Sequence, residues 1–125
     1  MITPLELELT IYQGATFTKT ITWKTGSPAV AVDLTNYTAK MQIRETYNST
    51  ATAIEIGTED SNGGGIVLGN NGVIELKITD TQTSGLTIKS GVYDLELTER
   101  DSNGAKIAVH KLLRGKVKIV PEVTK

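Results

Sequence analysis

The chain has 125 residues, a length that fits one domain, and we assign residues 1–125 to a single domain with short flexible ends. It contains no cysteine, which excludes disulfides and thiolate metal sites. The net charge of −1 and the lack of a long apolar run give no reason to expect nucleic acid or a membrane as a partner.

Two amphipathic segments open the chain. Residues 5–12 alternate Leu or Ile with mostly polar residues, and this period of two predicts a strand with one exposed face. Residues 16–24 carry apolar side chains on one face, but Lys19 interrupts the stripe. We expect Lys19 at a sheet edge, where an inward charge discourages pairing with another chain, or with its amine extended to solvent.

The clearest strand is predicted over residues 37–44, where apolar and polar residues alternate strictly after a turn built on Asp33. Residues 45–50 are polar and indicate a loop, and residues 51–56 indicate a short strand near a sheet edge. The stretch 58–65 ends in three glycines and is predicted to be the most flexible part of the chain.

Turn signatures organise the next part of the chain. The Gly-Asn-Asn-Gly run at residues 69–72 tolerates positive φ and predicts a hairpin between two flanking strands. Residues 79–88 form a polar connection in which we expect one helical turn, capped by Thr79 or Asp80 and anchored by the apolar Leu86.

The last two strands are predicted on either side of a turn at residues 101–104. The first starts at Gly91 and points Tyr93 and alternate leucines inward, and the second covers residues 105–120. The inward side chains expected in the second strand are Ile107, Val109, Leu113, Val117 and Ile119. Lys111 breaks this stripe, so we predict a β-bulge within residues 112–115.

About eight short strands at close spacing are typical of an antiparallel β-sandwich. The segment Lys89-Ser90-Gly91-Val92-Tyr93 resembles the tyrosine corner of immunoglobulin-like (Ig-like) domains. Leu95 stands where such domains carry their second cysteine. The predicted fold class is therefore all-β, an antiparallel Ig-like β-sandwich.

The sequence offers no catalytic or metal-binding constellation. His110 is the single histidine and has no partner within sequence reach, so we expect a residue at the surface or an edge. The Asp-x-Asn-Gly runs at residues 60–63 and 101–104 are interpreted as turns, because neither continues as a calcium loop. The outward carboxylates are expected to pair with Lys or Arg. We predict no enzyme, no cofactor and no metal, and, without a secretory signal, synthesis in a cytoplasm.

Five motifs follow one another in an order that carries a resemblance. They are Gln13-Gly14-Ala15-Thr16-Phe17, Val32-Asp33-Leu34-Thr35-Asn36-Tyr37-Thr38-Ala39, Gly72-Val73-Ile74-Glu75-Leu76, Gly91-Val92-Tyr93-Asp94-Leu95 and Leu113-Arg114-Gly115-Lys116-Val117. This series resembles small virion proteins of tailed bacteriophages and prophages. It is also similar to the N-terminal domain of phage baseplate upper proteins, which tie receptor-binding parts to the tail.

The resemblance implies a non-enzymatic structural module in the virion, made in the host cytoplasm, that docks in many copies in the tail, baseplate or neck. Its expected partners are other virion structural proteins and further copies of itself. A capsid decoration protein is the alternative, because nothing after Pro121 would hold a receptor-binding part.

The predicted interface consists of the residues least committed to a core. They are Pro4, Glu45, Tyr47, Asn48, Asp60, Asn62, Gly64 and Val123. An alternative of another class is a carbohydrate-binding Ig-like module that uses the two tyrosines expected to be exposed, Tyr12 and Tyr47. The scarcity of aromatic residues disfavours a glycan partner.

Overall fold

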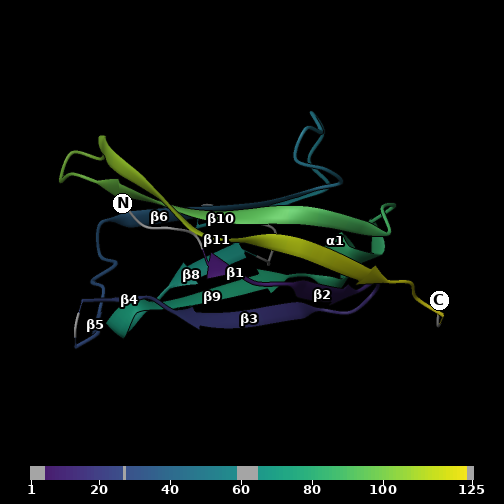
Figure 1. Ribbon diagram of the computed structural model, residues 1–125, viewed down its shortest axis with the longest axis horizontal. Helices are drawn as coiled ribbons and strands as arrows, with labels where there is room; N and C mark the ends of the chain where they lie inside the picture. The colour runs from purple at the N-terminus through teal and green to yellow at the C-terminus, as the bar shows by residue number, and fades with distance from the viewer. Residues whose placement is uncertain (1–4, 27, 59–64, 124–125) are drawn as a thin grey trace.

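The computed structural model describes residues 5–26, 28–58 and 65–123, and it is mostly β-strand. Two layers of sheet face each other, one formed around β6, β10 and β11 and the other by β3, β8 and β9 (Figure 1). The expected all-β class is confirmed.

The larger sheet has six strands in the order β1-β11-β10-β6-β7, with β2 also paired to β11. Their bounds are β1 Leu5–Glu6, β2 Leu9–Tyr12, β6 Tyr37–Arg44, β7 Ile54–Gly57, β10 Ser90–Arg100 and β11 Lys106–Val120. The expected strand over residues 37–44 and the short edge strand that follows it are both confirmed.

The expectation of a purely antiparallel sandwich is wrong at one side of this sheet, because β1 and β2 both run parallel to β11. Strands joined by a hairpin must be antiparallel. The first and last strands are not joined in that way, so their relative direction is set by how the chain crosses between the layers.

The smaller sheet has the order β3-β9-β8, and a separate two-stranded sheet pairs β4 with β5. The bounds are β3 Phe17–Thr22, β4 Lys24–Thr25, β5 Val30–Ala31, β8 Gly65–Leu68 and β9 Val73–Ile78. Lys19 lies on β3, at a sheet edge as expected. The described residues thus form eleven strands rather than about eight, because the first expected strand is divided and very short pairs occur.

The two predicted turns on the smaller sheet are confirmed. The 3₁₀ turn η1, Asn70–Gly72, joins β8 to β9, and Asn71 adopts φ 61° there. The helical turn α1, Asp80–Ser84, follows β9 with Thr79 as its N-cap. The Thr79 hydroxyl accepts a hydrogen bond from Gln82 N, and the Gln82 side chain accepts one from Thr79 N, which is a capping box.

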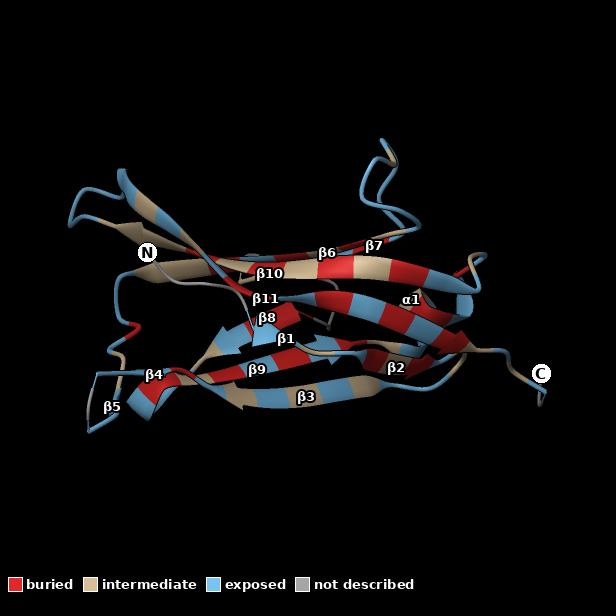
Figure 2. Ribbon diagram, viewed as in Figure 1, coloured by how far each residue is buried: buried red, intermediate tan, exposed pale blue. Residues whose placement is uncertain are grey.

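The core lies between the two layers, where the buried sides of their strands meet (Figure 2). Ile43 and Leu97 of the larger sheet are fully buried, as are Ile74 and Ile78 of the smaller one. Aliphatic side chains fill this space almost entirely, as the composition indicates. Burying each of them stabilises the fold by roughly 1.5–3 kcal/mol relative to an exposed position.

A β-bulge interrupts the pairing of β10 with β11, at the predicted place. Leu95 lies opposite Leu113 and Glu96 lies opposite Lys111, so Leu112 is the extra residue. Both Leu112 and Leu113 are buried, which means that the side chains before the bulge face the opposite way from a regular strand.

The bulge corrects the predicted inward face of the last strand. Ile107 and Val109 were expected inside but are 59% and 42% exposed. His110 lies on a part of β11 that, among the described residues, has no strand beside it other than β10, so the expected edge position is confirmed. Its ring, however, is only 26% exposed and contacts Trp23. We predicted a single alternation of inward and outward side chains for the whole strand. The extra residue at Leu112 reverses that alternation for the residues that precede it in β11.

Candidate interaction surface

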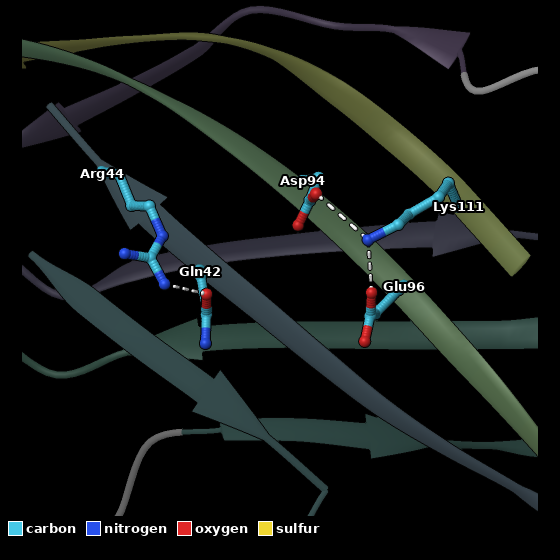
Figure 3. Close-up of polar contacts among 5 residues, drawn as sticks. All are labelled: Gln42, Arg44, Asp94, Glu96 and Lys111. Atoms are coloured by element: carbon cyan, nitrogen blue, oxygen red, sulfur yellow. Dashed lines mark hydrogen bonds and ion pairs between the residues drawn. The ribbon is translucent and has the colours of Figure 1, made fainter. Parts of the chain in front are cut away.

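The loop at residues 45–50 lies beside the outer face of the larger sheet, and side chains of β6 hold it there. Arg44 donates through Nη1 to the backbone oxygens of Ser49, at 3.1 Å, and of Thr50, at 2.9 Å. Its Nη2 donates to Gln42 Oε1 at 2.9 Å (Figure 3). Thr46 N also donates to Ser49 Oγ at 3.0 Å. The predicted loop therefore has a defined conformation fixed to the sheet.

Tyr47 extends this loop toward the strands on the far side of β10. Its ring lies 5.1 Å from the guanidinium carbon of Arg114 on β11, and Arg114 Nε lies 3.4 Å from Glu6 Oε1 on β1. The Tyr47 hydroxyl, and then the Glu6 carboxylate, raise the pKa of Arg114. Tyr47 remains 58% exposed, so this contact leaves most of its surface available to a partner.

Lys111 lies between two carboxylates at the centre of the same face (Figure 3). Its Nζ lies 3.4 Å from Asp94 Oδ2 and forms a close ion pair with Glu96. The hydrogen bond to Glu96 is the main cause that raises the pKa of Lys111, and the charge of Asp94 adds to it. Both carboxylates were expected to point outward and pair with a basic residue, and both do so.

Charges of the two signs alternate over this outer face and largely pair with one another. At the β7 side, Gln42 Nε2 donates to Glu55 Oε2 at 2.7 Å, and Lys40 lies 3.9 Å from the same carboxylate. Each exposed pair contributes at most about 1 kcal/mol to stability. Their collective effect is a surface of mixed charge.

An aromatic cluster lies between the layers below the β10–β11 hairpin. Trp23 packs edge-on against Tyr37 with ring centroids 5.7 Å apart, and His110 lies 5.6 Å from Trp23 and 6.2 Å from Tyr37. Because the rings contact one another, they leave no space for a bound cation between them. The cluster therefore packs the end of the core and is not a cation cage.

Glu99 borders this cluster. Its Oε1 lies 3.6 Å from His110 Nε2, which is buried and has no hydrogen-bond partner among the described residues. Burial, and then the charge of Glu99, raise the pKa of Tyr37. Sequence reasoning missed this group, although Lys111 in an apparently inward position was the signal that the strand changes phase beside His110.

A cleft of about 840 Å³ opens between the residue 31–35 segment, β8 and the turn at residues 69–71. Asp33 Oδ1 accepts a 3.0 Å hydrogen bond from Thr35 N, and the bonds from Thr35 lower the pKa of Asp33. No group of three or more side chains suited to a metal occurs in the described part of the chain.

The structure separates the predicted interface residues. Glu45, Tyr47 and Asn48 share the loop beside the outer face, whereas Val123, 93% exposed, follows the end of β11. The other four, Pro4, Asp60, Asn62 and Gly64, lie outside the described residues.

The two exposed tyrosines do not form one platform. Tyr12 pairs with Val120, whereas Tyr47 lies over Arg114, six positions earlier on β11. At roughly 3.3 Å per residue, these positions are about 20 Å apart along the strand. A single sugar ring cannot stack on both.

No helix in the described residues is long and apolar enough to cross a membrane. No family model matches the chain, and no curated protein is significantly similar to it.

Proposed function

We propose that the protein is an Ig-like structural module. In such domains one sheet contains strands C, F and G and the other contains B, E and D. The orders β6-β10-β11 and β3-β9-β8 correspond to these two sets, and β7 corresponds to the extra strand beside C in variable-type domains. The parallel N-terminal strands beside β11 are the main departure from the constant-type arrangement.

The proposed role is a non-enzymatic structural component of a tailed-phage virion, in the tail, baseplate or neck, that docks in several copies on other virion proteins. One observation carries it: the loop with Glu45, Tyr47 and Asn48 is held by Arg44 beside a broad sheet face of mixed charge. A prearranged polar surface with one exposed aromatic ring suits protein docking, since the ordering cost is largely met before binding.

A capsid decoration protein would dock through the same surface. The capsid and the tail, baseplate or neck roles therefore differ in the partner bound and not in how the chain binds it. The carbohydrate-binding alternative is less well supported, because Tyr12 and Tyr47 are separated along β11. An exposed aromatic ring alone is common at protein interfaces too.

The test is light scattering on the purified chain, alone and mixed with virion proteins encoded by neighbouring genes. We expect a complex of defined mass with a tail, baseplate or neck protein. A complex with the major capsid protein instead would support the decoration role. A chain that associates with no virion protein would overturn both, and binding to a glycan array would then favour the carbohydrate module.

A further inference from the structure

The first half of β11 is a sheet edge. β10 pairs with β11 from Lys106 onward, whereas β1 and β2 pair only with residues 113–114 and 117–120. Along residues 106–112, the side away from β10 therefore has no strand partner among the described residues. Backbone N–H and C=O groups on such a side can pair with another chain. The hairpin that carries this edge projects at the upper left of the molecule (Figure 1).

The other sheet edges are less suited to pairing with another chain. β7 and β8 have four residues each, and Glu55 on β7 is engaged by Gln42 and Lys40. β3 carries Lys19 on its inward side, which discourages pairing. The edge at residues 106–112 instead carries two exposed apolar side chains, Ile107 and Val109.

We propose that two copies of the chain pair antiparallel through residues 106–112 about a twofold axis at Val109, so that the larger sheet continues from one copy into the other. A twofold interface requires a surface that is complementary to itself. This inference deepens the proposed docking role and rests on it for the biological meaning of the dimer.

When two copies of residues 106–112 are placed antiparallel, the side chains that face each other are compatible. The cross-strand pairs about Val109 are Val109 with Val109, Ala108 with His110, Ile107 with Lys111, and Lys106 with Leu112 of the second copy. No two lysines lie directly opposite. Lys111 faces the exposed Ile107, on which its methylene stem can pack, and Lys106 faces the buried Leu112. The charge of Lys111 is already balanced by Asp94 and Glu96 of its own copy.

The small size of this edge determines how tightly the two copies are expected to bind each other. Seven residues with two exposed apolar side chains bury less than the roughly 1,200–2,000 Å² of stable interfaces. The isolated dimer is therefore expected to be weak and concentration-dependent. Docking several copies on a virion would raise their local concentration and populate the pair.

Sedimentation equilibrium over a concentration series tests the proposal with charge variants. Val109→Lys and Val109→Glu each place like charges directly opposite across the axis, and each should weaken self-association by on the order of tenfold or more. An equimolar mixture of the two variants should associate again, because Lys then faces Glu. Val67→Lys is the matched control, because Val67 is 60% exposed but lies on β8, and it should associate like the wild type.

A wild type that stays monomeric at the highest soluble concentration would overturn the proposal, as would a Val109→Lys variant that still dimerises. Dimerisation that appears only after removal of residues 1–4 would assign this edge to the chain's own N-terminus and would also overturn it. The proposed function is judged separately: a monomer that binds a virion protein refutes only the dimer, and a dimer that binds none refutes only the virion role.

Discussion

The hydroxyl of Tyr93 donates a 2.7 Å hydrogen bond to the backbone oxygen of Leu7, 86 residues earlier in the chain. Leu7 lies between β1 and β2, and β11 separates these strands from β10 in the sheet. The bond therefore connects β10 to the N-terminal strands across β11. In a tyrosine corner the hydroxyl bonds the backbone a few residues upstream. The Tyr93 hydroxyl instead fixes the N-terminal strands to the sheet, so the expected resemblance does not extend to this bond.

Tyr93→Phe removes the hydroxyl, so the backbone oxygen of Leu7 loses this hydrogen-bond donor. We expect the free energy of unfolding, measured by urea denaturation, to fall by about 1–3 kcal/mol. Amide hydrogen exchange should accelerate most in β2. Tyr12→Phe is the control, since Tyr12 is 60% exposed, and it should change stability by less than about 0.5 kcal/mol. Equal stability of the two variants would show that the Leu7 bond contributes nothing.

The same tyrosine predicts a loss of stability at alkaline pH. Burial, and then the charge of Glu6, raises the pKa of Tyr93 to about 12, whereas an unfolded tyrosine ionises near pH 10. Because the folded pKa is the higher one, the stabilisation is complete below about pH 10 and is lost as the pH rises toward about 12. Unfolding measured across this range should show a steeper decline for the wild type than for Tyr93→Phe. Parallel curves would contradict the assignment.

Gly115 explains how Leu7 comes so close to β11. A Cβ added at Gly115 would lie 2.3 Å from the Leu7 oxygen, so any side chain there must displace the N-terminal strands. We expect Gly115→Ala to lower the free energy of unfolding by about 1–3 kcal/mol, as overpacking does. Gly69→Ala serves as the control, because the nearest atom to its Cβ would lie at 3.7 Å. Thermal unfolding of the two variants gives the comparison, and a neutral Gly115→Ala would mean that the strands shift at no cost.

The local elements were predictable because their signals lie within a few residues. The alternation over residues 37–44, the Gly-Asn-Asn-Gly turn and the Thr79 cap each depend on near neighbours. The parallel pairing of β1 and β2 with β11 was not predictable in this way, because it joins residues such as Leu5 and Leu113 from opposite ends of the chain.

The candidate surface shows the same limit. The polar loop was predicted from composition, but the placement of Tyr47 over Arg114 depends on how β11 lies beside β10. The bulge near Leu112 was predicted, yet its consequence for His110 follows only if the phase of the strand is inverted before it. The Tyr47–Arg114 contact joins distant parts of the chain, and the effect on His110 depends on the register of β11. Neither can be predicted from a pattern of neighbouring residues.

The inverted phase has its own test in two truncations on β11. Leu112→Ala should lower the free energy of unfolding by about 2–5 kcal/mol, because Leu112 is 8% exposed in the core. Val109→Ala should cost less than about 0.5 kcal/mol, since Val109 is on the outer face. A regular strand with Val109 inside would give the opposite order in urea denaturation.

The docking role is tested at Tyr47. Tyr47→Ala removes an exposed ring whose contact with the solvent-exposed Arg114 contributes little to stability. It should therefore leave the fold intact while weakening the complex with a virion partner by on the order of tenfold, as loss of a central aromatic contact does. Tyr12→Ala is the matched control, because Tyr12 is similarly exposed but pairs with Val120, about 20 Å along β11 from the Arg114 that Tyr47 contacts. Isothermal titration with the partner found by light scattering separates the two: if both variants bind like the wild type, the surface around Tyr47 is not the docking site.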